Sequence, residues 1–548
     1  MRLTPLNNFY LPVFLLFSFF VAKSLYTLLL FHMWIETAHY FYILTLRSFQ
    51  NDLLLLLPLV GVLFLFEKVS ICKRCIFFLS LIYALLVIVV SYIDIQTLFT
   101  FNRRLSLVDT VRFSNHGVEN QFISIYLLNF LPLAFITAGL TYVFSKSKSS
   151  FFIIALISAV ILLLPTKLKY FKTDYITNNF FQNNIDFSFA KKVPNLQKKE
   201  KEFTKHFHYQ KGDEDNGSLI VIFAESWSFS DSKHFSGLTK DNLPLYDKVS
   251  KEGKSFVNFF AEGSTTDQAY IALFSGLPPL LYNFSDDTYS AYAFQNPFIS
   301  SLNKAGYETI FLKAYSLDFL NLKEYLKQLG FKKMYGKDEL FNTPPFYTMN
   351  TVPDTTLYDK ALEIISKEQK EGKKFTLFLT TISTHIPYYV PEGTTQKAAY
   401  NFSDKAFYDF YRKLKTNGYL KNNYLLLFGD HRKMTPLDPG EYKKYGKSAY
   451  GRIVCSLWGK NIKPEVQKAY FNQSDITYSI LKKFTAKALL PDNYNDIFSG
   501  KIKRGYAVHD TFADRNEIFV FPKTYTEKAQ KYIQQVRGHY QYQAQQHK

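Results

Sequence analysis

Acidic and histidine side chains directly follow two apolar segments that have the length of buried strands. Glu225 follows 218–223, and Asp430 and His431 follow 424–428. In an open α/β sheet, ligands bind outside the carboxyl ends of the strands, so we expect these side chains at one edge of a sheet. Carboxylate and imidazole groups bind divalent cations such as Mn²⁺ and Zn²⁺. The sequence therefore predicts a metal site.

A further histidine, His385, follows a third apolar segment, 375–380. A single histidine after a strand is usually a packed or capping residue. At the expected edge, however, this one would lie beside Glu225 and the Asp-His pair. We therefore include His385 among the candidate functional residues.

The segment 262–270 contains Thr265 and Thr266 just before an apolar, helical stretch. A threonine at a helix start presents its hydroxyl beside backbone N–H groups that lack helical partners, and these suit a phosphate. A bound cation would lower the pKa of that hydroxyl and make it a nucleophile. The same residues are also typical of an ordinary helix N-cap. The segment alone leaves both interpretations open.

The elements around these residues are typical of an α/β domain. Short segments rich in Ile, Val, Leu and Phe alternate with amphipathic stretches of helical length. We expect a mainly parallel sheet covered by helices. The predicted strands are 218–223, 309–312, 375–380, 424–428 and 453–457, and the predicted helices include 354–371 and 404–416.

The N-terminal part of the chain is apolar in a different way. A helix needs about 20 apolar residues to cross a bilayer, and several stretches approach or exceed this length. Basic residues flank the ends that we place inside, so everything after residue 165 is expected on the extracytoplasmic side of the cell membrane. The five predicted spans are built on the apolar stretches 9–34, 53–66, 75–93, 122–144 and 151–165.

We therefore divide the chain into four parts. A transmembrane domain of about five helices (1–165) is followed by a basic juxtamembrane connector (166–217), an extracytoplasmic catalytic domain (218–525) and a polar C-terminal tail (526–548).

Composition narrows the class of partner. The net charge of +19 fits a nucleic acid, a membrane surface or an anionic substrate. Much of it lies on the predicted cytoplasmic loops and the lysine-rich connector, and no aromatic-and-basic grouping of a nucleic-acid module is present. We expect a membrane and no nucleic acid. Cys72, Cys75 and Cys455 lack the companions that a zinc site needs.

Taken together, these features resemble the lipoteichoic acid synthase and phosphoglycerol transferase family of the alkaline phosphatase/sulfatase superfamily. The resemblance is carried by the predicted spans, Glu225-Ser226 after the first strand, the threonine-centred turn and Gly429-Asp430-His431. It implies a sulfatase-like fold and one divalent metal, Mn²⁺, with Mg²⁺ or Zn²⁺ as alternatives. The implied ligands are Glu225, the nucleophilic threonine, Asp430 and His431.

The resemblance also bears on which threonine is the nucleophile. Counting from Gly263-Ser264 favours Thr265, whereas counting back from Gly276 favours Thr266. The match is longer on the C-terminal side, so we choose Thr266 and keep Thr265 as the alternative.

Two further residues are expected to contact the substrate. His385 stands in Thr-His-Ile-Pro-Tyr, which resembles the family's Asn-His-Phe-Pro-Tyr, and would lie at the phosphate or headgroup. Polyglycerolphosphate synthases have His-Gly where this chain has Lys313-Ala314, and the family's Trp and Arg are replaced by Leu320 and Leu322. Lys313 is therefore our candidate for a phosphate-facing charge, and a repetitive lipoteichoic acid product is not expected.

The resemblance implies transfer of a phosphoglycerol or related phospholipid headgroup, through a phospho-threonine intermediate, onto an envelope glycan or lipid. The implied donor is a membrane phospholipid such as phosphatidylglycerol. The alternatives are a sulfatase-like hydrolase or phosphodiesterase and a phosphoethanolamine transferase. A non-enzymatic alternative is an inactive module that binds wall polymer.

Overall fold

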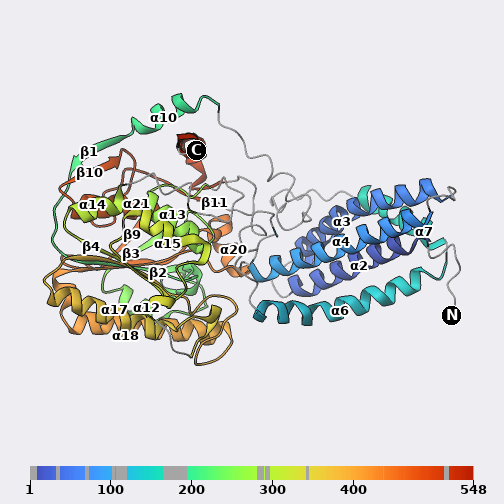
Figure 1. Ribbon diagram of the computed structural model, residues 1–548, viewed down its shortest axis with the longest axis horizontal. Helices are drawn as coiled ribbons and strands as arrows, with labels where there is room; N and C mark the ends of the chain where they lie inside the picture. Colours follow the sequence, from blue (N-terminus) through green and yellow to red (C-terminus); the bar gives the residue numbers. More distant parts are fainter. Residues whose placement is uncertain are drawn as a thin grey trace.

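The computed structural model describes residues 9–32, 38–67, 73–101, 105, 120–147, 149–163, 194–280, 289, 297–340, 345–435, 437, 439–510 and 518–546. Most of the predicted connector, 166–193, and Cys72 lie outside these ranges. Within them, a bundle of apolar helices lies beside a larger part in which helices cover a sheet (Figure 1).

The centre of the larger part is an eight-stranded sheet with the order β5-β4-β6-β2-β7-β8-β3-β9. Its strands run parallel to their neighbours except β8, which is antiparallel to both β7 and β3. The strands are β2 (Leu219–Ala224), β3 (Lys254–Phe260), β4 (Glu308–Lys313), β5 (Lys333–Tyr335), β6 (Phe375–Thr380), β7 (Tyr424–Gly429), β8 (Cys455–Gly459) and β9 (Glu465–Asn472).

Helices cover both faces of this sheet (Figure 1). One face carries α13 (Thr266–Ser275), α14 (Phe298–Lys304), α15 (Leu322–Leu329) and α21 (Gln473–Phe484), and the other carries α12 (Pro244–Ser250), α17 (Asp354–Lys370) and α18 (Gln396–Thr416). Shorter helices lie in the connections: α11 (Lys233–Ser236), α16 (Lys337–Leu340), α19 (Tyr419–Asn422) and α20 (Pro439–Tyr445).

The α/β class predicted from the sequence is confirmed, with a mixed sheet. The three central strands β6, β2 and β7 are buried at every position, which explains why their sequences are continuous apolar runs. The helix predicted at 404–416 begins earlier, at Gln396, because the Thr395 side chain accepts a hydrogen bond from the Ala398 N–H and caps it there.

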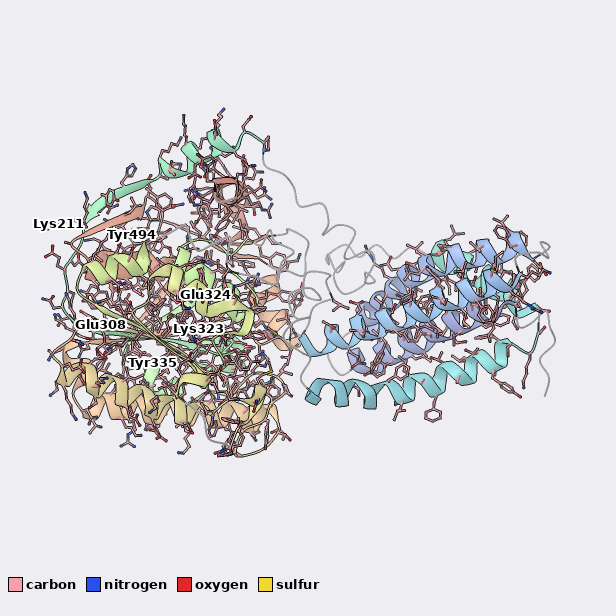
Figure 2. The ribbon with its side chains drawn as sticks, in the orientation of Figure 1. Lys211, Glu308, Lys323, Glu324, Tyr335 and Tyr494 are labelled. Atoms are coloured by element: carbon pink, nitrogen blue, oxygen red, sulfur yellow. The ribbon has the colours of Figure 1, made fainter. Side chains whose placement is uncertain are left out.

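Two small antiparallel sheets complete this part: β1 (Phe207–Lys211) with β10 (Lys487–Pro491), and β11 (Ala507–Asp510) with β12 (Ile518–Phe521). Lys211, at the end of β1, lies far from the apolar helices (Figure 2). The predicted tail contains a helix, α22 (Thr526–Gln546), and the end of the predicted connector contains another, α10 (Leu196–Thr204). These two helices are joined by the hydrogen bond between His539 Nδ1 and Glu200 Oε2, 2.7 Å.

The apolar bundle consists of α2 (Leu11–His32), α3 (Ala38–Phe66), α4 (Lys73–Phe101), α6 (Asn120–Phe144) and α7 (Ser149–Leu163). Among the described residues, 2 helices are long and apolar enough to cross a membrane, or 3 if α6 and α7, bent by 117°, form one broken span. The structure therefore supports two or three spans, and five crossings stay a prediction.

An ion pair lies inside this bundle. Lys23 Nζ of α2 is 2.8 Å and 2.7 Å from the two carboxylate oxygens of Asp52 of α3, and both side chains are 1% exposed. This geometry shows that the Lys23 side chain faces the interior of the bundle. The pair therefore joins α2 to α3 inside the bundle.

We expect Lys23→Met to destabilise the bundle, because it leaves the Asp52 carboxylate buried without its partner. Loss of one member of a buried pair costs about 3–5 kcal/mol, whereas replacing both members by apolar residues is often neutral. Thermal unfolding in detergent should therefore show a large loss for Lys23→Met and recovery in Lys23→Met/Asp52→Leu. Equal losses in the single and double variants would contradict this account.

Candidate active site

The predicted metal ligands come together at the carboxyl ends of the central strands. Glu225 follows β2, and Asp430 and His431 follow β7, its parallel neighbour in the sheet. All three side chains are at most 1% exposed. One ligand atom from each lies within 4.8 Å of the others, which makes them a candidate metal site.

Thr266 points into this group. It is the first residue of α13, and its Oγ1 lies 2.8 Å from Asp430 Oδ2, 3.2 Å from Glu225 Oε2 and 3.5 Å from His431 Nε2. Unlike the three buried side chains of the candidate metal site, Thr266 is partly exposed.

Thr265 is placed differently. It precedes α13 with an extended backbone and makes no side-chain capping hydrogen bond. Its Oγ1 is buried and has no hydrogen-bond partner within the described part of the chain. Of the two threonines that the sequence left in competition, the geometry favours Thr266.

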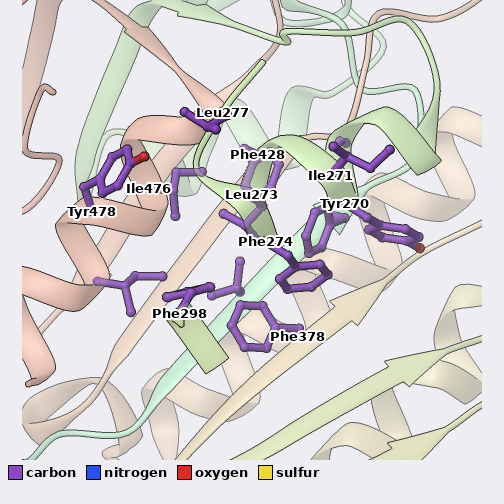
Figure 3. Close-up of a cluster of buried hydrophobic side chains, with 14 of the residues drawn as sticks. Tyr270, Ile271, Leu273, Phe274, Leu277, Phe298, Phe378, Phe428, Ile476 and Tyr478 are labelled. Carbon is purple, nitrogen blue, oxygen red and sulfur yellow. The ribbon is translucent and has the colours of Figure 1, made fainter. Parts of the chain in front are cut away.

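The packing of α13 explains why Thr266 is held at this point. Tyr270 and Phe274 of α13 lie over the sheet beside Phe378 of β6 and Phe428 of β7 (Figure 3). The Tyr270 hydroxyl also donates to Thr380 Oγ1, 2.9 Å, at the end of β6. The apolar run after the Thr-Thr pair therefore fixes the first turn of the helix over the strand ends.

Hydrogen bonds orient the histidine of the site. His431 Nδ1 lies 2.8 Å from the carbonyl oxygen of Arg432. A carbonyl oxygen only accepts, so Nδ1 carries a proton and Nε2 is the ring nitrogen that faces the two carboxylates. This is the arrangement in which a histidine binds a metal through Nε2.

Electrostatics also favour a cation here. Burial and the neighbouring Glu225 carboxylate raise the pKa of Asp430 to about 7. Burial opposes a charge on His431, but the Asp430 and Glu225 carboxylates outweigh it and raise the pKa of this imidazole. Two buried carboxylates, an imidazole nitrogen and a hydroxyl form a donor set that fits Mn²⁺, Mg²⁺ or Zn²⁺.

Lys313 lies close to the same group. It ends β4 and is 8% exposed, and its Nζ is 5.3 Å from the ring centroid of Tyr270. Burial lowers the pKa of Lys313 to about 8, although the carboxylates of Glu225, Asp267 and Asp430 oppose this. A partly desolvated amine near these carboxylates is placed to attract an anionic phosphate.

His385 follows β6, and its Nδ1 donates to the carbonyl oxygen of Ile386. Burial lowers the pKa of His385 to about 4, and nearby His431 and Lys313 add to this effect. The imidazole is therefore neutral at physiological pH, with Nε2 as the atom that can accept a proton.

Sequence reasoning missed several residues around the site. Asp267, the second residue of α13, is 8% exposed, and its carboxylate acts on the pKa of Lys313. Its position directly after Thr265 and Thr266 is the sequence signal that could have identified it. Arg432 pairs with Glu441 through two hydrogen bonds of 3.1 Å and 2.8 Å and ties the loop after His431 to α20. No local sequence pattern predicts the ion pair between Arg432 and Glu441.

Comparisons with known proteins match the part of the chain that contains this site. Residues 218–486 match the sulfatase family model. Phosphoglycerol transferase I of Citrobacter koseri is 25% identical over 244 residues, which are 40% of this chain and 31% of that protein. The chain thus spans under a third of the length of the curated relatives that it matches.

Solved structures give weaker similarities. A protein of the alkaline phosphatase superfamily from Vibrio parahaemolyticus is 20% identical with a TM-score of 0.48, covering 57% of this chain and 80% of that one. The lipoteichoic acid synthase LtaP of Listeria monocytogenes is 20% identical with a TM-score of 0.44, covering 53% of this chain and 78% of that one.

The family match covers the eight-stranded sheet and every candidate residue from Glu225 to His431. Residues 218–486 therefore form a domain of the sulfatase family, and the chain is similar to phosphoglycerol transferases over part of its length.

Proposed function

We propose that this protein is a membrane-anchored, metal-dependent transferase. It moves the phosphoglycerol headgroup of a phospholipid, phosphatidylglycerol, onto a glycan or lipid of the cell envelope. The observation that carries the proposal is the position of Thr266 Oγ1, within 3.5 Å of Glu225, Asp430 and His431. The similarity to phosphoglycerol transferase I supports the choice of headgroup.

The metal would be held by Glu225, Thr266, Asp430 and His431, and we propose Mn²⁺. A divalent cation bound there supplies positive charge that lowers the pKa of the threonine hydroxyl and offsets the charge on phosphoryl oxygens.

In the first step, Thr266 Oγ1 attacks the phosphorus of the lipid headgroup. As the new bond forms, the Thr266 hydroxyl loses its proton, which ends on the departing diacylglycerol oxygen. The bond between phosphorus and the diacylglycerol oxygen breaks, and diacylglycerol departs with a proton. The headgroup phosphate stays on Thr266 as a phosphodiester, and the ammonium form of Lys313 attracts its free oxygens.

In the second step, an acceptor hydroxyl attacks the same phosphorus. Neutral His385 can take the proton of this hydroxyl at Nε2, because its Nδ1 is already engaged by the carbonyl oxygen of Ile386. The Thr266 Oγ1–phosphorus bond breaks, and the threonine recovers its proton. The products are free enzyme and an acceptor that carries phosphoglycerol.

The apolar bundle would place this chemistry beside its lipid substrate. We propose five crossings within residues 1–165, with the connector 166–217, the catalytic domain 218–525 and the C-terminal segment 526–548 on the extracytoplasmic side of the cell membrane. A donor in the outer leaflet is then delivered next to the catalytic domain.

Headgroup labelling tests the proposal. The purified full chain is incubated with Mn²⁺ and detergent-solubilised phosphatidylglycerol that carries ³²P in its headgroup, and label on the protein and released diacylglycerol are measured. Phosphatidylethanolamine serves as a second donor. We expect protein-bound label with phosphatidylglycerol. Release of free glycerol phosphate in the presence of sugar or lipid acceptors would identify a hydrolase, and no turnover of either lipid would refute the transferase.

We expect Lys313→Met to weaken substrate binding, because it removes a buried positive charge from the phosphate site. Loss of one charge-assisted contact should raise KM about 10-fold or more and lower kcat less. Lys323→Met is the matched control, since Lys323 pairs with Glu339 on the surface, 2.8 Å away. Unchanged KM in Lys313→Met would remove this lysine from the substrate site.

A further inference from the structure

A fully buried glutamine connects the two loops that form the candidate active site. Gln473 is the first residue of α21 and is 0% exposed. Its Oε1 accepts from the backbone N–H of Glu262, 3.2 Å, and its Nε2 donates to the carbonyl oxygens of Asp430, 2.6 Å, and Gly429, 3.4 Å. One side chain therefore binds the backbone of both loops.

Each of these loops carries reacting groups. The loop that begins at Ala261, after β3, leads from Glu262 to Thr266 at the start of α13. The loop after β7 carries Asp430 and His431. The contact between Thr266 Oγ1 and Asp430 Oδ2, 2.8 Å, joins two segments that are 164 positions apart in the sequence. The distance between these two loops therefore depends on the contacts that hold each loop in place.

The glutamine itself is held firmly. The Glu262 carboxylate accepts from the backbone N–H and the hydroxyl of Ser474, 2.7 Å and 2.8 Å. Asp475 accepts from the Asn472 N–H, 2.8 Å, and pairs with Arg504, 2.6 Å. Ser474 thus joins the first turn of α21 to the loop that leads to Thr266, and Asp475 caps that turn beside Gln473.

Only an amide meets the requirements of this position. It offers one acceptor to the Glu262 N–H and two donors to the two carbonyl oxygens. A glutamate of the same size would keep the acceptor but place carboxylate oxygen against carbonyl oxygen. A methionine would fill the space and leave three buried backbone groups without a partner.

We propose that Gln473 is a positioning residue for the active site. It sets the distance between Thr266 on one loop and Asp430 and His431 on the other. The Thr266 hydroxyl and the metal ligands are thereby kept close enough to bind one cation. Sites of this kind tolerate errors of about 0.5 Å before activity falls. The role in turnover rests on the proposed transferase function, whereas the role in forming the metal site does not.

The test compares Gln473→Met and Gln473→Glu with a matched control, Asn495→Leu. Asn495 is also 0% exposed and also bonds several backbone groups, including the carbonyl oxygens of Tyr470 and Arg504, both 2.7 Å. Within the described residues, the hydrogen bonds of its side chain go to Tyr470, Lys503 and Arg504 and not to the two loops. The readouts are Mn²⁺ affinity by calorimetry, kcat and KM for headgroup transfer, and thermal unfolding in EDTA.

We expect both Gln473 variants to bind Mn²⁺ about 10-fold more weakly and to lose about 10- to 100-fold in kcat, with KM little changed. Asn495→Leu should lower the unfolding temperature as much, yet keep wild-type Mn²⁺ affinity and kcat in the folded protein. If Gln473→Met does not fold, Gln473→Glu decides, since it keeps the size and the acceptor.

Wild-type Mn²⁺ affinity in a folded Gln473 variant would overturn the inference, and so would equal losses of affinity in Asn495→Leu. Failure of the proposed function looks different: the wild type would turn over no phospholipid, while Gln473→Met would still weaken Mn²⁺ binding.

Discussion

Replacing Thr266 by alanine should abolish headgroup transfer, with a loss of about 10⁴-fold or more in kcat. The variant lacks the only hydroxyl in the described part of the chain that contacts Glu225, Asp430 and His431 together. The measurement is ³²P labelling of the protein and diacylglycerol release from phosphatidylglycerol. No protein-bound label should form, because the atom that carries the phosphate is absent.

Two variants sharpen this expectation. Thr265→Ala should stay within about threefold of the wild type, because Thr265 Oγ1 has no partner within the described residues and its removal leaves no donor or acceptor unpaired. Thr266→Ser keeps a hydroxyl and should retain measurable labelling. Label that persists in Thr266→Ala and vanishes in Thr265→Ala would reverse the assignment of the nucleophile.

The positions of the central strands could be predicted from sequence because burial on both faces makes each a continuous apolar run. The predicted strand 424–428 became β7, Tyr424–Gly429, and 375–380 became β6 with the same bounds. Parallel neighbouring strands end at the same edge of a sheet, so Glu225, Asp430 and His431 could be placed together from their positions after these runs.

Contacts between distant segments could not be predicted in this way. The bond from Gln473 to the Asp430 carbonyl spans 43 positions, and that from Glu262 to Gln473 spans 211. Glutamine has no strong positional preference that would reveal such a role. The antiparallel direction of β8 could not be predicted either, because an apolar strand has the same sequence pattern whether it runs parallel or antiparallel to its neighbours.

The C-terminal segment shows a similar limit. The stretch from 526 has a polar composition, which predicted a tail, yet α22 forms there and buries Ala529, Ile533, Val536 and Tyr540. These four apolar residues lie at helical spacing, three or four positions apart. Their periodicity was present in the sequence, but the high content of Gln and Lys concealed it.

Replacing Asp430 by asparagine should have opposite effects on stability with and without metal. In EDTA at pH 8 the wild type holds the carboxylates of Asp430 and Glu225 buried together. The folded-state pKa of Asp430, about 7, lies above the ordinary aspartate value of 3.8. The contribution of this group to stability is therefore fully present below pH 3.8 and is lost as the pH rises through 7.

Asparagine does not ionise, so it removes the cost of burying a second negative charge beside Glu225. Its side-chain oxygen can still accept from the N–H groups of Ser226 and His431, which donate to Asp430 Oδ1 at 2.8 Å and 2.7 Å. We therefore expect Asp430→Asn to be more stable than the wild type in EDTA at pH 8, by about 1–2 kcal/mol. With saturating Mn²⁺ the order should reverse, because binding stabilises only the folded state that can bind. Mn²⁺ affinity should fall about 100-fold or more, and transfer should be lost with it.

Asp404→Asn separates the effect of a buried charge from the effect of the metal. Asp404 is 1% exposed, its pKa is also raised to about 7 by burial, and it accepts from the N–H groups of Leu245 and Tyr246, both 2.8 Å, away from the site. Each Asp404 oxygen accepts from a different N–H, so asparagine leaves one of them unpaired, and this variant should be less stable than the wild type in EDTA. It should nevertheless keep the full stabilisation by Mn²⁺ and full activity. If Asp430→Asn is stabilised by Mn²⁺ as much as Asp404→Asn is, then the carboxylate of Asp430 does not bind the metal, and Thr266 must be activated in another way.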